Sequence, residues 1–213
     1  MRDDPYYSAE VLVEVEPYLH LEPYLRCWLD PEKLFIGKYV LDVGSGECTY
    51  TRLIAEKFRP KAIVASDLRP KRMLPTIRVN RNPLLKFVAA DCLALPFRDG
   101  AFDVVWCNGV LCELPNHEQA VLEIRRVLKN GGVYAGWEPN PFNPVNLYRY
   151  FFKPHPAHHR LFWWWRVRRI FETSGFHVMI RFFYAKLPSV RNRFLATCIG
   201  IIAQKTCYEL HSA

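Results

Sequence analysis

The chain of 213 residues is 50% hydrophobic and 15% aromatic, which excludes an intrinsically disordered or collagen-like protein and fits one domain with a modest elaboration. Its net charge of +8 is unevenly spread: residues 1–138 carry 18 basic and 19 acidic side chains, whereas residues 139–213 carry eleven basic and two acidic ones. This asymmetry favours a near-neutral front part with a cofactor site and a basic back part that meets an anionic substrate, lipid headgroup or nucleic acid. A merely solvated basic surface is the alternative.

The sequence has no recognisable membrane-spanning or targeting segment. No apolar run approaches the ~20 residues that span a bilayer, and the first four residues (MRDD) lack the apolar region of a signal peptide. We therefore expect a cytoplasmic protein.

Cysteine and histidine spacing gives no metal or redox motif. The seven cysteines include no CxxC pair, so we interpret them as free thiols. His155, His158 and His159 lie beside prolines and lack a second ligand cluster, so we predict no metal site.

In chain order, the pattern alternates between strands and helices. Residues 1–38 predict a helical lead-in, interrupted at Pro17 and Pro23. We then expect a strand over 39–43, a helix over 49–58, a strand over 62–66, a helix over 70–80, strands over 85–90 and 102–107, a helix over 116–128, a turn over 129–132 and a strand over 133–137. Such alternation is typical of a parallel sheet covered on both faces, with ligands at the carboxyl ends of the strands.

Beyond Glu138 the pattern changes. A loop rich in Pro and Asn, an aromatic and basic stretch to residue 160, and a helix that Gly175 ends precede two strands, over 176–184 and 194–203. The short connection between these strands predicts that one of them is antiparallel to the rest. The expected fold is an α/β, doubly wound, mostly parallel seven-stranded sheet with one antiparallel strand near the C-terminus and helices on both faces.

The segment Leu41–Thr49 (LDVGSGECT) places Gly44 and Gly46 between the first strand and the first helix, where glycines allow a sharp turn and close approach to a ligand. It is neither GxGxxG, because Thr49 stands three after Gly46, nor a P-loop, because it has no GK[ST]. Asp67 follows the second strand about twenty residues later, where a carboxylate can accept both ribose hydroxyls, and Asp91 follows the third. For either acid alone, a helix cap or turn is the alternative.

On these residues the sequence resembles the class I S-adenosylmethionine-dependent methyltransferases, in the branch with the quinone and sterol methyltransferases. The resemblance covers 39–175 and rests on LDVGSGECT (41–49), Asp67, AADCLALPFRDGAFDVVWCN (89–108) and LEIRRVLKNGGVYAGWEPN (122–140). It implies a Rossmann-like methyltransferase domain over 39–205, with an acceptor-side lid over 139–175 and a tail over 206–213. The family usually has a third glycine where this chain has Cys48.

The resemblance also implies S-adenosylmethionine as cofactor and a set of site residues. The methionine end would be held by Asp42, Gly44, Ser45 and Gly46, the ribose by Asp67 with Leu68 beside it, the adenine by Asp91 and Cys92, and the sulfonium would be flanked by Asn108 and Gly109. The cofactor is a zwitterionic amino acid joined to a neutral adenosine, so it needs carboxylates and backbone groups, and Asp42 with Glu47 argues against a phosphate.

The acceptor is expected to be a small, apolar or amphipathic molecule. Alignment and desolvation can supply much of the catalysis; if a proton must leave, Glu113 is the candidate base and Asn108 the second catalytic candidate, while an exposed loop carboxylate is the alternative for Glu113. A nucleic-acid acceptor is unsupported, because Asn108–Leu111 (NGVL) is no [DN]PP[YFW] motif and no Pro-Cys dipeptide occurs. A nicotinamide-dependent reductase and a non-catalytic S-adenosylmethionine-binding protein remain alternatives.

The helix that Gly175 ends has two faces. Helical spacing places Trp163, Trp164, Val167, Ile170 and Phe171 towards the sheet. The apolar Leu161, Phe162 and Trp165 fall instead among Arg166, Arg168, Arg169 and Glu172. Apolar groups among arginines suit a lid over an apolar substrate or peripheral contact with an anionic membrane surface, unless the N-terminal helix covers them.

Overall fold

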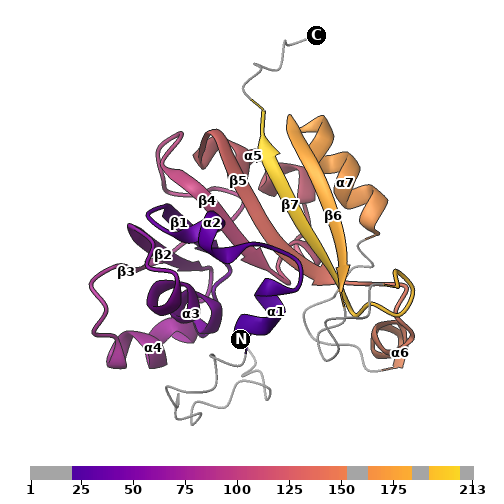
Figure 1. The fold of residues 1–213 in the computed structure, drawn as a ribbon, viewed down its shortest axis with the longest axis horizontal. Helices are drawn as coiled ribbons and strands as arrows, with labels where there is room; N and C mark the ends of the chain where they lie inside the picture. The colour runs from indigo at the N-terminus through magenta and orange to yellow at the C-terminus, as the bar shows by residue number, and fades with distance from the viewer. Residues whose placement is uncertain (1–20, 153–162, 184–191, 207–213) are drawn as a thin grey trace.

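A computed structural model describes residues 21–152, 163–183 and 192–206. Its single sheet has seven strands in the order β3-β2-β1-β4-β5-β7-β6 (Figure 1). The strands are β1 Tyr39–Val43, β2 Ala62–Asp67, β3 Leu85–Ala89, β4 Phe102–Asn108, β5 Leu128–Pro139, β6 Phe176–Phe183 and β7 Cys198–Lys205. β7 pairs antiparallel with both β5 and β6, and the other pairings are parallel, so the predicted doubly wound sheet with one antiparallel strand is confirmed.

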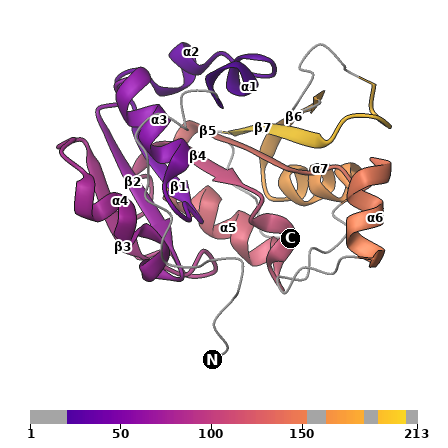
Figure 2. The same ribbon diagram turned by 90° about the horizontal axis from the view of Figure 1, so that it is seen from below.

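Helices cover both faces of the sheet. They are α1 Glu22–Arg26, α2 Pro31–Phe35, α3 Thr49–Lys57, α4 Leu74–Val79, α5 His117–Val127, α6 Pro144–Phe152 and α7 Trp164–Thr173, with the 3₁₀ turns η2 Pro70–Met73 and η3 Leu111–Glu113. Figure 2 shows α1, α2 and α3 on one side of the sheet and α5 and α7 on the other. Each layer has its own core, one formed largely by α5, α7 and the sheet and the other by α1 to α3 with Trp28 stacked on Trp106.

The direction of winding positions the site. From β1 the chain winds outward through β2 to β3, then returns to place β4 on the other side of β1. The loops that follow β1 and β4 therefore leave neighbouring carboxyl ends in opposite directions, which is the place where open α/β sheets bind ligands. Val43, the last residue of β1, lies level with Ser66 of β2 and with Cys107 of β4, so the three strands end within one residue of one another.

Several elements differ from the sequence expectation. Pro17 and Pro23 were expected to interrupt the lead-in helix. Pro23 instead lies in the first turn of α1, where a missing N–H costs nothing, and Pro17 falls outside the described residues. Residues 129–132 do not form a separate turn, because β5 already begins at Leu128, opposite Phe102, and a register shift follows. β7 begins at Cys198 rather than at residue 194, because the amides of Leu195 and Ala196 turn back to the carbonyl of Asn192.

α6 was not expected at all. Its N-terminus carries a recognisable signal, since the Asn143 side chain accepts the amides of Val145 (3.0 Å) and Asn146 (3.3 Å), and Pro144 occupies the first helical position. Figure 1 shows α6 beyond the carboxyl end of β5. The segment after the fifth strand is thus a capped helix next to the ligand-binding edge of the sheet.

Candidate functional site

The glycine loop after β1 meets the loop after β4. Gly44 has a φ of +69°, and a Cβ built on it would lie 2.3 Å from Cγ2 of Val110, so only glycine fits beneath that side chain. The amide of Ser45 donates to the carbonyl of Ser66 (2.9 Å), which ties the loop to the end of β2. Two segments about 65 residues apart in sequence therefore lie against each other at the carboxyl ends of the strands.

Asp67 lies against the same loop, as the sequence predicts for a ribose-binding acid. Its carboxylate is buried and accepts the amide of Gly46 (2.9 Å) on one oxygen and the amide of Arg69 (2.8 Å) on the other. Arg72 stands 3.8 Å from the first oxygen. Each carboxylate oxygen can accept more than one hydrogen bond, so Asp67 keeps capacity for ligand hydroxyls while it also orders the glycine loop.

Asp42 is buried beneath the loop. Its carboxylate accepts the hydroxyl of Thr51 (2.5 Å) from α3. Burial raises the pKa of Asp42 to about 7; the Thr51 hydrogen bond opposes this rise and the nearby Asp67 charge adds to it. A cationic group arriving here would favour the ionised form, which suits the ammonium of an amino-acid ligand.

Cys48 replaces the glycine that the family usually has, and its backbone explains why that position favours glycine. Cys48 adopts a left-handed conformation with φ 64° as the residue preceding α3, and its side chain is fully buried. Such a conformation costs a non-glycine residue roughly 1–2 kcal/mol. The loop therefore keeps its expected turn despite the substitution.

The loop after β3 carries Asp91 and Cys92. Asp91 is exposed, two residues beyond the end of β3, and accepts the amide of Leu93 (2.9 Å); Cys92 is half-buried, and burial raises its pKa to about 11. The amide of Ala90 donates to the carbonyl of Asp67 (3.1 Å), which brings this loop beside the second acid. Leu68, 68% exposed, presents an apolar side chain to solvent next to the same acids.

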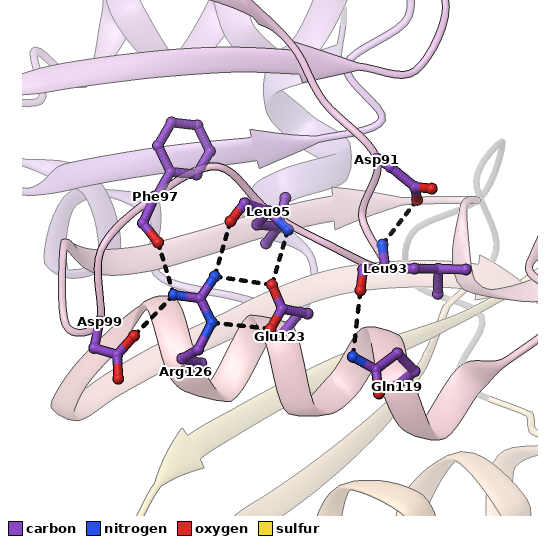
Figure 3. Close-up of polar contacts among 8 residues, drawn as sticks. All are labelled: Asp91, Leu93, Leu95, Phe97, Asp99, Gln119, Glu123 and Arg126. Carbon is purple, nitrogen blue, oxygen red and sulfur yellow. Dashed lines mark hydrogen bonds and ion pairs between the residues drawn. The ribbon is translucent and has the colours of Figure 1, made fainter.

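An ion pair on α5 holds this loop in place (Figure 3). Arg126 donates to the carbonyls of Leu95 (2.8 Å) and Phe97 (2.7 Å) and forms ion pairs with Glu123 and Asp99, each 2.8 Å long. Glu123 in turn accepts the amide of Leu95 (2.8 Å). The sequence analysis missed these residues, because their partners lie about thirty positions away and follow no periodicity.

Asn108 ends β4, and Gly109 follows it in the loop that meets the glycine loop through Val110. The side-chain oxygen of Asn108 is buried and has no hydrogen-bond partner among the described residues, so it is an acceptor available to a ligand. The amide of Gly109 donates to the carbonyl of Trp137 (2.8 Å), which ties this loop to β5. Glu113, the expected base, ends η3 and is exposed.

Glu138, at the carboxyl end of β5, is a site residue that the sequence analysis used only as a boundary. Its fully buried carboxylate accepts the amides of Leu111 and Cys112, each at 3.1 Å, and burial raises its pKa to about 7. Asp67 was recognised as an acid directly after a strand. The same criterion applied to the fifth strand would have found Glu138.

Beyond β5, three asparagines fix the segment over residues 140–146 to the turn before β7. The side chain of Asn140 donates to Arg193 and Ala196, that of Asn143 to Leu195, and that of Asn146 to Thr197, all through backbone carbonyls 2.6–2.8 Å away. This network lies next to an aromatic cluster. The centroid of the Phe142 ring lies 5.1, 5.8 and 5.7 Å from the ring centroids of Trp163, Trp165 and Phe194, respectively.

The helical projection is confirmed for Val167, Ile170 and Phe171, whereas Trp163, which was expected towards the sheet, stacks on the ring of Trp165 instead. Val167, Ile170 and Phe171 are buried, whereas Trp165 is 47% exposed beside the exposed Arg166, Arg168 and Arg169. Trp163 precedes the helix, and Leu161 and Phe162 lie outside the described residues. The described parts of α1 and α2 pack on the opposite face of the sheet, around Trp28, and so do not cover Trp165.

In the part of the chain that the structure describes, no group of three or more His, Cys, Asp or Glu side chains is arranged so that it could hold a metal ion. His155, His158 and His159 fall outside this part.

The residues at this edge fit S-adenosylmethionine. Asp42 and Asp67 provide buried carboxylates, Gly44 leaves room that a Cβ would fill, and the Asn108 oxygen is unpartnered within the described chain. These groups suit an ammonium, ribose hydroxyls and a sulfonium. Arg72, whose guanidinium lies next to Gly46, also faces Asp67 at 3.8 Å.

Comparison with known proteins gives the same assignment. Residues 41–136 match a family model described as a methyltransferase domain. A demethylmenaquinone methyltransferase of Thermus thermophilus is 32% identical over 121 residues, 54% of this chain and 55% of the relative; a 2-methyl-6-phytyl-1,4-hydroquinone methyltransferase of Synechocystis is 31% identical over 148 residues, 68% of this chain and 45% of the relative. The chain thus spans about half the length of these curated relatives.

Solved structures agree at the level of the fold. An S-adenosylmethionine-dependent methyltransferase from Mesorhizobium loti superposes with a TM-score of 0.70 and 16% identity, over 87% of this chain and 97% of that one. The order of the strands, the glycine loop between β1 and α3, and these relatives together place the chain in the class I S-adenosylmethionine-dependent methyltransferase family, in its quinone- and sterol-methyltransferase-like branch.

Proposed function

We propose that this protein transfers a methyl group from S-adenosylmethionine to a small, apolar or amphipathic acceptor. The observation that carries this proposal is the glycine loop between two buried acids, Asp42 and Asp67, at the place where the sheet changes direction. A nicotinamide is disfavoured, because the loop lacks the third glycine of GxGxxG.

In this proposal, different loops at the carboxyl ends of the strands bind different parts of the cofactor. Asp42, Gly44, Ser45 and Gly46 hold the methionine end, Asp67 and Leu68 the ribose, Asp91 and Cys92 the adenine, and Asn108 with Gly109 flank the sulfonium. When bound, S-adenosylmethionine supplies an activated methyl group together with its leaving group. The exposed Leu68 packs against the nucleoside, which gives a reason for a large apolar side chain in this position.

The chain itself contributes orientation and exclusion of water. The loop over residues 109–114 lies against the glycine loop through Val110, so the groups after β4 are held close to those after β1. Phe142, three residues after the end of β5, begins the aromatic cluster, which suits the acceptor's apolar part. Fixed geometry in a water-poor site accounts for much of the acceleration of an in-line transfer.

Two relatives suggest an acceptor to test, because their names specify demethylmenaquinone and a phytyl hydroquinone. Incubation of the protein with isotope-labelled S-adenosylmethionine and a prenylated hydroquinone is expected to label the hydroquinone. A panel with a nucleic acid, a free amino acid and a prenylated hydroquinone decides the acceptor class: labelling of either of the first two, with none of the third, contradicts an apolar acceptor.

Glu113→Gln is expected to lower kcat by roughly 10²-fold if Glu113 removes a proton from the acceptor, because glutamine cannot act as a base. Affinity for S-adenosylmethionine should stay unchanged, since the side chain points from an exposed turn. Glu118→Gln, at an exposed acid in the first turn of α5, is the matched control. Equal turnover in both variants and the wild type would contradict a role of Glu113 as a base and would mean that catalysis rests on orientation of the reactants.

We also propose that the acceptor-side surface makes peripheral contact with an anionic membrane. Large apolar side chains that are exposed gather there: Val145, Tyr148, Tyr150, Phe151, Phe152, Trp165, Phe194 and Leu195. Exposed arginines at 166, 168, 169 and 193 lie on the same segments. Aromatic side chains beside cations are typical of surfaces that rest at the headgroup level. No described helix is long and apolar enough to cross a bilayer.

Trp165→Ser is expected to weaken binding to anionic vesicles by roughly five- to tenfold. In the wild type, the exposed part of the indole would be transferred from water into the membrane, and the variant loses the free energy of that transfer. Binding should also fall with salt, since each arginine near the surface contributes about 1 kcal/mol that ions screen. Tyr39→Ser is the matched control. Tyr39 is also an exposed aromatic residue, with Lys61 and Lys129 over its ring. It is the first residue of β1, at the amino-terminal ends of the strands and therefore away from the acceptor-side surface.

Co-sedimentation of the wild type and both variants with phosphatidylserine and phosphatidylcholine vesicles measures their membrane binding. Absence of binding at low salt, or an equal loss in the Tyr39→Ser variant, would contradict contact through the acceptor-side surface.

A further inference from the structure

The loop between β4 and α5 is held from one side by Glu138. Its carboxylate receives the amides of Leu111 and Cys112, each at 3.1 Å, and the amide of Gly109 binds the carbonyl of Trp137 in the same strand (2.8 Å). Three hydrogen bonds thus connect the end of β5 to one short loop. They span 26 to 28 positions of sequence and join the fourth and fifth strands beyond the end of their ladder.

This loop has a second contact, on the cofactor side. Val110 sits between the bonds to Gly109 and Leu111, and its Cγ2 occupies the space above Gly44. Asn108 directly precedes this loop, and Glu113 lies near its C-terminal end. Any change in the bonds to Glu138 therefore shifts the wall that would face the sulfonium and the side chain that would face the acceptor.

We infer that Glu138 is a positioning residue, which holds the loop over residues 109–114 against the glycine loop and does so only as a carboxylate. This inference rests on the proposed function, because the loop matters for transfer only if the site binds S-adenosylmethionine. An ionised carboxylate offers acceptors on both oxygens, and both are used here. A protonated acid turns one oxygen into a donor that would face an amide N–H, so one of the two bonds is lost.

The surroundings of Glu138 place this change near neutral pH. The titratable groups facing it are Cys107 on β4, Cys112 and Glu113 on η3, Tyr134 on β5 and Cys198 on β7. Burial raises the pKa of the three thiols and of the Tyr134 phenol, so these four groups stay neutral. None of these neighbours is a cation, and burial raises the pKa of Glu138 to about 7.

The sign of the resulting pH dependence follows from this raised pKa. The folded protein favours the protonated acid, so this group's contribution to stability is greatest below the ordinary value of 4.5 and is lost as the pH rises through about 7. Ordering of the loop runs the other way, because it needs the ionised form. A purely structural role and a positioning role therefore predict opposite trends over the same pH range.

NMR of the full-length protein tests the inference without any cofactor or acceptor. On titration from pH 5 to pH 9, the amide signals of Leu111 and Cys112 should shift together with one midpoint near pH 7, and their hydrogen-exchange protection should fall roughly tenfold on the acid side. Glu138→Gln, which has one acceptor in the same place, should remove this titration. Glu113→Gln should keep it.

Amides that do not titrate in the wild type overturn the inference, and so does a titration that disappears in Glu113→Gln. If the purified protein transfers methyl groups, kcat/KM should decrease below pH 7 in the wild type and become independent of pH over this range in Glu138→Gln, at a value roughly tenfold lower than the wild-type plateau. Loss of the amide titration refutes the role of Glu138, whereas absence of any transfer with the titration intact refutes the proposed function alone.

Discussion

Replacement of Gly44 by valine is expected to abolish binding of S-adenosylmethionine. The new side chain would need a φ near +69°, which β-branched residues avoid, and its Cβ would start 2.3 Å from Cγ2 of Val110. Either the glycine loop or the loop after β4 has to move. A valine at this position would therefore push apart the two loops between which the cofactor is proposed to bind.

Gly37→Val is the matched control for this prediction. Gly37 has an almost identical φ of +67°, but nothing lies within 4 Å of a Cβ built on it. Both variants carry the same backbone strain, of roughly 1–2 kcal/mol. Only Gly44→Val should lose the ligand in calorimetry, and circular dichroism checks that each variant folds.

A double variant separates strain from collision. Val110→Ala removes the methyl groups that a Cβ at residue 44 would meet, so Gly44→Ala with Val110→Ala should bind more tightly than Gly44→Ala alone. Wild-type affinity in a folded Gly44→Val protein would mean that this loop does not hold the cofactor.

Asp67→Ala is expected to weaken S-adenosylmethionine binding by roughly 10² to 10⁴-fold. Two hydrogen bonds from ribose hydroxyls to a carboxylate are worth about 1.5–3 kcal/mol each. The structure adds a second cause: the amides of Gly46 and Arg69 lose their acceptor, so the glycine loop is also loosened. The loss should therefore exceed that of a residue which touches the ribose alone.

Asp103→Ala is the matched control, because Asp103 also accepts a backbone amide, that of Tyr39 (2.8 Å), and pairs with a cation, Lys129. It lies on β4 away from the carboxyl end of the strand, so its loss should affect stability but not affinity.

A second ligand isolates the ribose contact. Wild-type protein should bind S-adenosylhomocysteine more tightly than its 2′-deoxy analogue, and Asp67→Ala should bind the two about equally. Discrimination that persists unchanged in the variant would place another group at the ribose.

Much of the sheet could be predicted from the sequence because strands such as β1, β2 and β4 are short apolar runs bounded by turn residues. β1 (YVLDV) was located to the residue, and β2 and β4 each extend one residue beyond the expected end. The antiparallel strand near the C-terminus followed from a connection too short for a crossover, which the structure bears out in β7. Such signals are local, so a single sequence contains them.

The site was predictable only in part. Gly44, Gly46 and Asp67 were singled out by spacing, and the structure brings them together, although their binding roles stay proposals. Glu138 and Arg126 act through backbone groups of distant loops, and these partners depend on how the chain folds. The helix α6 was not expected, because its start signal, Asn143 followed by Pro144, lies in a segment rich in Pro and Asn that is also typical of a loop.

The proposal that this is an S-adenosylmethionine-binding enzyme is tested most directly by calorimetric titration of the full-length protein with S-adenosylmethionine and, separately, with NADH. We expect saturable binding of S-adenosylmethionine at one site per chain, lost in Gly44→Val and retained in Gly37→Val, and no saturable heat with NADH. Saturable binding of NADH, with none of S-adenosylmethionine, would contradict the assignment of the glycine loop and both acids.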